Sequence, residues 1–417
     1  MTPHAAAKDN TRWIIVGMSF LALGMSFLAR NSLGLMMADM EKTDGWSRSF
    51  LSSAGAVMLI FMAITSPVAG NLVDRIGARK LLTVGLICVA LGLIGGALSP
   101  SAWLFIATFG VVGGIGFGVV ANHVVSTVIA FYFVERRGLA TGVASSGSTA
   151  GQLIMIPILA ATLSAIGWRW SYVALAAATL ALILLVLRYL DGGGAVVARA
   201  RAAAREPIGK RVGFLFRSWP FHGLFWGFLL CGFTTAGVIE VHFLPFAASC
   251  GFPIMASATA YGVLSAFNLG GMVLSGYLTD RMNRSVLLGG IYTVRAAALL
   301  LLFYMPHEQT LLFVFAVAFG LVDYASIPPT AGLVARRLGL PIMGLAMGII
   351  SSGHAAGAAL GALMGGVLYD LFAQYNFLWV AAIGVSLVGA VFSWTVRDIA
   401  PGAPTGGRHA TPAPAAA

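Results

Sequence analysis

Charged residues are scarce in this sequence. They make up 9% of its 417 residues, whereas hydrophobic residues make up 59% and the mean hydropathy is +0.91. So few charges cannot cover the surface of a water-soluble chain of this length. Apolar runs of about 20 residues, each long enough to cross a bilayer, recur along it. The sequence therefore predicts an all-α membrane protein.

Other absences narrow the possible functions. The three cysteines, Cys88, Cys231 and Cys250, have no metal-ligand spacing. There is no GxxxxGK[ST] phosphate loop, which argues against an ATP-driven pump. The predicted loops are too short to build a catalytic domain, so we expect no enzyme activity, no cofactor and no metal. The N-terminus lacks a small-residue cleavage site after a short apolar segment, so the first helix should be retained.

The basic residues predict the topology. With the N-terminus in the cytoplasm, most of the 25 Lys and Arg residues fall on the cytoplasmic side, as the positive-inside rule requires. The formal net charge of +11 is thus a topology signal and not evidence of nucleic-acid binding. We expect a multi-pass cell-membrane protein, of the bacterial inner membrane, with both termini cytoplasmic. The twelve expected helices cover residues 12–38, 47–72, 80–99, 102–133, 138–164, 170–190, 219–247, 256–279, 286–305, 309–335, 342–370 and 375–396.

Two stretches of the chain recur at one offset of 206 residues. GNLVDRIGARK at 70–80 returns as GYLTDRMNR at 276–284, and LATGVASSGSTAG at 139–151 returns as LAMGIISSGHAAG at 345–357. Two matches at one offset indicate that the halves are copies of one helical unit. The sequence predicts a bundle at 1–190, a cytoplasmic linker at 191–217, a second bundle at 218–399 and a disordered tail at 400–417. Two such copies favour a transporter whose site lies at the seam between them.

The repeated loop predicts a conformational latch. Gly77 permits a tight turn, and Asp74 can cap a neighbouring helix end or pair with Arg75 or Arg79. Such a cluster can hold the cytoplasmic ends of two bundles together. The residues expected in the two latches are Asp74, Arg75, Gly77 and Arg79, and their partial copies Asp280 and Arg281.

The motif GxLxDRxGxRK resembles the signature of the major facilitator superfamily. That resemblance covers the whole chain and implies two six-helix bundles, a central cavity and alternating access. The stretches DGWSRSFLSSAGAV at 44–57 and GVVGGIGFGVV at 110–120 resemble bacterial monocarboxylate porters and oxalate/formate exchangers. Met272 stands where that group commonly carries a substrate-binding arginine. The Gly-Pro motif typical of drug/proton antiporters is absent from the fifth helix, which weakly disfavours drug efflux.

Ionisable groups at bilayer depth are costly, so each should face the bundle interior or a partner. Arg30 offers a planar fork that can bind a carboxylate through two hydrogen bonds, or it could form a structural ion pair with Glu240 or Asp323. Asp323 or Glu240 can carry a proton, or be held in a permanent salt bridge. We expect Arg295 to be a structural partner of one of these carboxylates. The residues predicted to bind substrate are Arg30, Asn31, Asn122, His123, Gln152, His242 and His354.

The helical periodicity makes these expectations more specific. His354 and Ser351 share a face that should oppose the face of Ser148 and Gln152 across the seam. Asn122 and His123 point about 100° apart on a helix, so at most one should face the cavity squarely. His242 is as consistent with the cavity wall as with a ligand. The histidines lie on separate helices without ligand spacing, which argues against a metal site.

The charges at depth suggest a mechanism. Two arginines and two carboxylates sum to zero, so a monocarboxylate together with one proton restores neutrality. We therefore predict proton-coupled transport of a small organic anion by a protein that acts as a monomer in the lipid bilayer. An anion exchanger, an efflux transporter of hydrophobic compounds and a non-transporting membrane receptor remain as alternatives.

Overall fold

The computed structural model describes residues 3–190, 206–305 and 308–398. Residues 191–205 of the predicted linker and the predicted disordered tail at 400–417 lie outside the described residues. The described part consists of helices joined by turns and bends, and it contains no strand. Within the described residues, ten helices are long and apolar enough to cross a membrane. The fold is therefore that of an all-α, multi-pass membrane protein.

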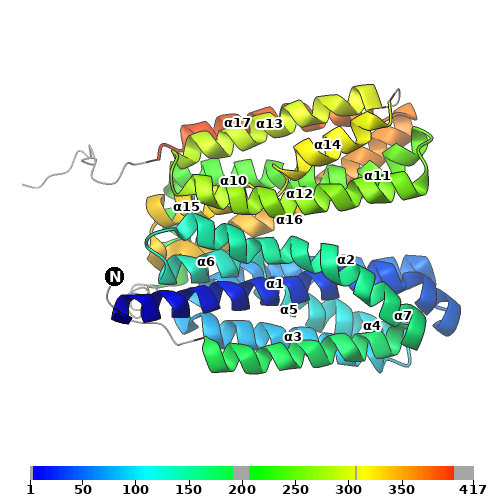
Figure 1. Ribbon diagram of the computed structural model, residues 1–417, viewed down its shortest axis with the longest axis horizontal. Coiled ribbons are helices and arrows are strands. Elements are labelled where there is room, and N and C mark those ends of the chain that lie inside the picture. Colours follow the sequence, from blue (N-terminus) through cyan, green and yellow to red (C-terminus); the bar gives the residue numbers. More distant parts are fainter. Residues whose placement is uncertain (1–2, 191–205, 306–307, 399–417) are drawn as a thin grey trace, which may run out of the picture.

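Figure 1 shows two groups of helices lying side by side. The first group consists of α1 (Pro3–Asp44), α2 (Arg48–Ile76), α3 (Ala78–Ala97), α4 (Ala102–Phe105), η1 (Ile106–Gly113), α5 (Gly114–Val119), α6 (Asn122–Tyr132) and α7 (Arg137–Tyr189). The second consists of α10 (Trp219–Gly232), η2 (Phe233–Ile239), α11 (Glu240–Ser249), α12 (Ile254–Thr279), α13 (Arg284–Tyr304), α14 (Thr310–Gly320), α15 (Ile327–Arg337), η4 (Leu340–Ile342), α16 (Met343–Phe372) and α17 (Asn376–Thr395). Between the groups in the chain comes α9 (Ile208–Arg217).

Two features explain why ten long apolar helices appear where the sequence predicted twelve. The expected helices 138–164 and 170–190 form the single helix α7, which bends at Gly167, where φ is +73°. The expected helix 309–335 is interrupted, because residues 321–326 leave the helical conformation between α14 and α15. Only α14 remains as a shorter apolar helix in that span. That the chain crosses the bilayer twelve times therefore stays a prediction.

The two groups meet along two seams, α2 against α16 and α7 against α12. Glycines lie at the closest points. Gly70 and Gly344 leave no room for a Cβ atom against each other's main chain, and Gly138 and Gly276 repeat this at the other seam. Small residues let the helix backbones approach closely. These contacts lie at the end of the molecule that carries α9, which we call the linker end. At that end the two groups are closed against each other.

The fourth helix of each group is broken at nearby positions of the repeat, residues 120–121 in the first group and 321–326 in the second, which correspond to 115–120 under the offset of 206. In the first group, Val120 and Ala121 leave the helical conformation between α5 and α6, with Ala121 extended at φ −133° and ψ 163°. In the second group, the break lies between α14 and α15 and contains Asp323. With the offset of 206, Asn122 at the start of α6 corresponds to Pro328 near the start of α15. Both breaks face the space between the groups.

Candidate functional site

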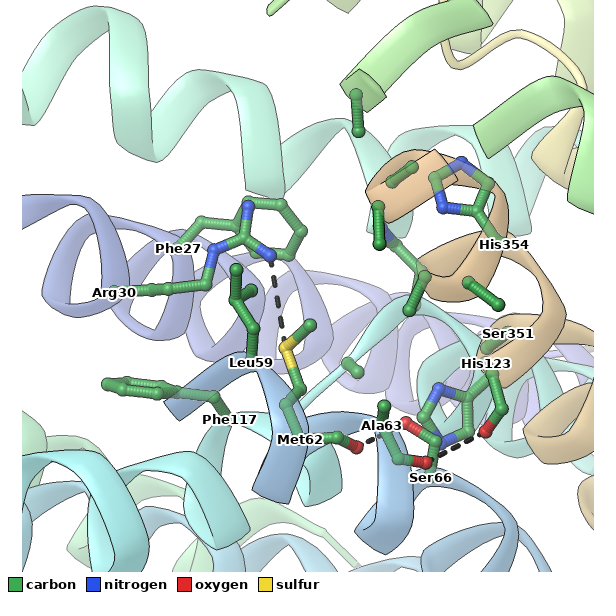
Figure 2. Close-up of a pocket in the computed structure, with 18 of the residues that line it drawn as sticks. Phe27, Arg30, Leu59, Met62, Ala63, Ser66, Phe117, His123, Ser351 and His354 are labelled. Atoms are coloured by element: carbon green, nitrogen blue, oxygen red, sulfur yellow. Dashed lines mark hydrogen bonds between the residues drawn. The ribbon is translucent and has the colours of Figure 1, made fainter. Parts of the chain in front are cut away.

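A cavity of about 680 Å³ lies between the two groups. Its wall is mainly apolar, with phenylalanine, methionine, leucine and alanine side chains from both groups. Figure 2 shows Arg30, Met62, Phe117, His123 and His354 converging on it from different helices. At its linker-end side, Ser352 Oγ of α16 donates to the carbonyl of Ala63 on α2 at 2.8 Å and joins the two groups. The cavity is therefore closed towards the linker end.

Arg30 of α1 lines this cavity without a carboxylate partner. Its guanidinium lies over the ring of Phe27, 4.3 Å from the ring centroid. Its Nη1 approaches Met62 Sδ at 3.9 Å, a weak acceptor. Among the described residues, no ion pair joins Arg30 to Glu240 or to Asp323. The fork of Arg30 is thus available to an oxyanion that enters the cavity.

Glu240 lies at the start of α11, on the cavity wall. Tyr324 donates a hydrogen bond through its Oη to Glu240 Oε1 at 2.8 Å. The Glu240 side chain is otherwise exposed to the cavity. Since Tyr324 follows Asp323 in the chain, this hydrogen bond connects the break in the fourth helix to the cavity wall.

Asp323 itself is buried within the break, with 4% of its surface exposed. Asn268 of α12 donates to its Oδ2 at 2.9 Å, whereas Oδ1 has no hydrogen-bond partner. The same Asn268 accepts from the Tyr324 amide at 3.4 Å. Within the described residues, one oxygen of this buried carboxyl group is therefore left without a hydrogen-bond donor.

Arg295 of α13 is wholly buried and holds this break in shape. Its Nη2 donates to the main-chain oxygens of Val322, at 2.8 Å, and of Asp323. Its Nη1 approaches Cys231 Sγ at 3.0 Å and Thr234 Oγ1 at 3.1 Å. The sequence predicted a structural partnership with a carboxylate. Within the described residues Arg295 holds the segment of Asp323 through its main-chain carbonyls, which the helix break frees, and no ion pair to the carboxylate forms. Neither Cys231 nor Thr234 carried a sequence signal for this role.

The predicted substrate-binding residues divide into two sets. Asn31, Asn122, His123 and His354 line the cavity together with Arg30, whereas His242 and Gln152 are not among the lining residues. His242 is buried, and its Nε2 lies 3.1 Å from the Ala362 carbonyl. Gln152 lies on α7, which packs on α1 and α12, while α16 packs on α2 and α10. Of the two faces predicted to oppose each other, that of Ser351 and His354 lines the cavity, whereas Gln152 does not.

His354 and His123 occupy different surroundings. His354 packs on the ring of Phe228 with centroids 4.9 Å apart, and its Nε2 lies 3.4 Å from Thr235 Oγ1. His123 is 1% exposed, its Nε2 has no hydrogen-bond partner, and the main chain of Ser66 contacts its ring. The sequence predicted that at most one of Asn122 and His123 would face the cavity squarely, and both residues contribute to its wall at the start of α6. No cluster of three metal-ligating side chains occurs within the residues described.

The latch residues lie at the linker end. Asp74 accepts from the amides of Gly344 at 2.9 Å and Leu345 at 3.1 Å, at the start of α16. Asp280 repeats this with the amides of Gly138 at 2.7 Å and Leu139 at 2.9 Å, at the start of α7. Each carboxylate thus caps a helix that belongs to the other group.

The arginines of the latch loop behave differently from the prediction. Arg75 donates to the Glu206 carbonyl at 3.3 Å and Arg79 to the Leu187 carbonyl at 2.6 Å, so neither pairs with Asp74. The cation that pairs with Asp74 is Arg211 of α9, at 2.6 Å. Sequence reasoning missed Arg211, because only folding brings the linker helix against α2.

Two smaller parts of the predicted latches are clear in the structure. Gly77 has φ +83° between α2 and α3, which confirms the tight turn. Arg281 is exposed, and its guanidinium lies over the ring of Tyr277, 3.7 Å from the centroid.

Comparisons with known proteins agree with this architecture. The family model described as "Major Facilitator Superfamily" matches residues 19–339 and 273–417. An uncharacterized MFS-type transporter, YcxA of Bacillus subtilis, is 28% identical over 392 residues, which cover 92% of this chain and 94% of that protein. Monocarboxylate transporter 11 of Mus musculus is 26% identical over 404 residues, covering 94% and 89% of the two chains.

Solved structures share the fold at low sequence identity. The proton:xylose symporter XylE, bound to 6-bromo-6-deoxy-D-glucose, matches with a TM-score of 0.73 at 16% identity, over 93% of this chain and 96% of its own. The human organic anion transporter MFSD10 matches with a TM-score of 0.73 at 17% identity, over 94% of this chain and 100% of its own. These two likenesses concern the fold alone.

Proposed function

This chain belongs to the major facilitator superfamily of membrane transporters, and from that premise we propose that it carries a small organic anion, a monocarboxylate, together with a proton. The family consists of transporters and not of enzymes. Two observations support the choice of substrate. Arg30 faces the cavity without a carboxylate partner, and relatives over most of the chain include proteins named monocarboxylate transporters.

Arg30 is the observation that carries the proposal. An arginine at membrane depth is costly when it lacks an anion. Here its partners are a ring and a sulfur atom, neither of which neutralises the charge. A carboxylate entering the cavity would gain a bidentate, charge-assisted pair and remove that cost. The apolar side chains around Arg30 suit the rest of a short organic acid.

The proton is carried by Asp323, with Glu240 as the second candidate. Asp323 has one oxygen without a partner and is shielded from water, so a proton on it removes a buried charge. Tyr324 connects its segment to Glu240 in the cavity. Anion on Arg30 and proton on Asp323 enter together, so the loaded site is electrically neutral, as the empty site is.

Alternating access follows from the two seams. The positive-inside bias supports a cytoplasmic linker end and cytoplasmic termini. With that orientation, the contacts at the linker end close the cavity towards the cytoplasm. We propose twelve membrane crossings, counting α7 as two, and bundles 1–190 and 218–399 that rock about the cavity while 191–217 links them. The protein acts as a monomer in a bacterial inner membrane.

The test is uptake by purified protein in liposomes. Labelled short monocarboxylates and dicarboxylates are offered with and without an inward proton gradient. Uptake of a monocarboxylate stimulated by the gradient is expected. Arg30→Gln should lower uptake by about ten-fold or more, because one charge-assisted pair is lost, whereas Arg217→Gln, an exposed residue of α9, should leave it unchanged. Uptake that persists in Arg30→Gln would contradict the assignment of the anion site.

A second variant separates symport from exchange. Asp323→Asn should remove stimulation by the proton gradient while leaving exchange of one acid for another across the membrane. Counterflow without any response to pH in the unaltered protein would indicate an anion exchanger. Drug resistance on expression, with no acid uptake, would favour efflux of hydrophobic compounds.

A further inference from the structure

The start of α6 differs from its repeat partner in hydrogen-bonding capacity. α6 is 11 residues long and begins inside the cavity, where Ala121, Asn122 and His123 all line the wall. The amides of Val124 and Val125 bond to the Ala121 carbonyl. No side chain caps this helix end. The amides of Asn122 and His123, the first two of α6, precede those bonds and are two of the donors that a helix cannot satisfy internally.

The start of α15 shows the opposite arrangement. The repeat partners of Asn122 and His123 are Pro328 and Pro329, which have no amide hydrogen. The neighbouring amides of Ile327 and Thr330 bond to the carbonyls of Tyr324 and Ser326. At the two corresponding positions the second group therefore has no amide donors, and its break carries a carboxyl, whereas the first group presents two amides and the positive end of a helix dipole.

A second observation points to a ligand at α6. His123 is 1% exposed and lines the cavity, yet its Nε2 has no hydrogen-bond partner. Buried polar groups are normally satisfied, so a wall that leaves an imidazole nitrogen unsatisfied beside two amide donors is arranged for a ligand that fills it. Helix N-termini with free amides bind oxyanions.

We propose that the amide end of α6, with the imidazole of His123, is a second carboxylate-binding subsite of the cavity, separate from Arg30. It rests on the proposed function in that the ligand is an organic acid. The carboxylate oxygens accept from the amides of Asn122 and His123, and His123 offers its imidazole beside them. The occupant is either the other carboxylate of a dicarboxylate held by Arg30 or the single carboxylate of a monocarboxylate that has moved from Arg30.

The repeat itself supplies the test variant. Asn122→Pro removes one amide hydrogen and gives α6 the proline that α15 has at the corresponding position. Proline is tolerated at the first position of a helix, and Ala121 before it already has the extended conformation that proline requires. Asn122→Ala is the matched control, because it removes the side chain and keeps the amide. Any difference between these variants reports on the main-chain donor.

Binding is measured on the purified full-length protein in detergent, from the rise of the thermal unfolding midpoint with propionate or with succinate. Asn122→Pro should bind succinate about ten-fold more weakly than Asn122→Ala, since a hydrogen bond to a charged group is lost. An equal loss for propionate identifies the single carboxylate as the occupant, and a loss for succinate alone identifies the second one. Equal binding of both acids by Asn122→Pro and Asn122→Ala overturns the subsite.

Further variants keep the result decisive. If Asn122→Pro does not fold, His123→Phe, which keeps a ring without nitrogen, should bind succinate several-fold more weakly than His123→Gln, and equal affinities overturn the proposal. Arg30→Gln tests the primary site separately. Loss of binding in Arg30→Gln with none in the α6 variants refutes the subsite alone, whereas the reverse refutes the role of Arg30 alone. If the unaltered protein responds to neither acid, both fail.

Discussion

The two seams at the linker end have the same hydrogen bonds and different charges around them. Asp74 caps α16 and Asp280 caps α7, each through two main-chain amides of the opposite group. Asp74 is fully buried and pairs with Arg211, whereas Asp280 is exposed. Arg137 is near enough for its charge to interact with Asp280, but no ion pair between them forms in the described part of the chain.

The difference shows that the linker takes part in one seam. Arg211 donates to the side chains of Asn71 and Asp74 in the first group and to the Pro341 carbonyl, at 2.9 Å, in the second. One side chain of α9 thereby holds both groups. A carboxylate taken out of water needs a cation beside it, and in the described part of the chain α9 supplies one to Asp74 and none to Asp280. The α2–α16 seam should therefore resist opening more than the α7–α12 seam.

Removing the two carboxylates gives the largest expected contrast. Asp74→Ala leaves Arg211 buried without an anion, which should cost about 3 kcal/mol or more. Asp280→Ala removes only a helix cap at an exposed position and should cost about 1 kcal/mol. The thermal unfolding midpoints of both purified variants measure this difference. Equal decreases would mean that the burial of Asp74 and its pairing with Arg211 do not strengthen that seam.

Removing the linker cation should have an intermediate effect. Arg211→Ala leaves Asp74 with its two amide donors, so we expect the cavity to open towards the linker end more often while folding is retained. Spin labels on α2 and α16 at the linker end measure the change in their separation. Labels on α7 and α12 serve as the internal comparison, and a change of equal size at both pairs would contradict a role confined to one seam.

The smallest effect is expected for the exposed arginines that follow the two carboxylates. Arg75→Ala loses a 3.3 Å hydrogen bond to the Glu206 carbonyl, and Arg281→Ala loses a contact with the Tyr277 ring. Such surface interactions contribute about 0–1 kcal/mol. Neither variant should shift the unfolding midpoint as much as Asp280→Ala does. A large decrease in the unfolding midpoint of Arg75→Ala would instead mean that Arg75 is the cation that stabilises the α2–α16 seam.

The two similar halves and the apolar helices could be predicted because each is visible in short stretches of the sequence. The offset of 206 residues pairs Asp74 with Asp280, and the structure places each at an equivalent helix end. The partner of Asp74 was not predictable from the same pattern. Arg75 and Arg79 are its neighbours in sequence, but Arg211, more than a hundred residues away, is its neighbour in space.

The sequence predicted several residues that line the cavity, but it did not predict how the backbone around them is arranged. Arg30, Asn31 and His354 reach the cavity as expected from their polarity at membrane depth. The helix breaks were not foreseen, because VVANHVV at 119–125 contains neither glycine nor proline and reads as continuous helix. The role of Arg295 depends on carbonyls that become available only once the break at 321–326 exists. Tertiary packing decides such features, and local propensity does not.

The glycines of the seams have a consequence for how fast the two groups can separate. At the closest points, Gly70 meets Gly344 and Gly138 meets Gly276, main chain against main chain. Glycine has no side-chain rotamers, so parting these surfaces requires no interlocked side chains to disengage. We therefore expect the rate of separation to depend on the hydrogen bonds of Asp74 and Asp280 to amides of the opposite group more than on side-chain packing at these points.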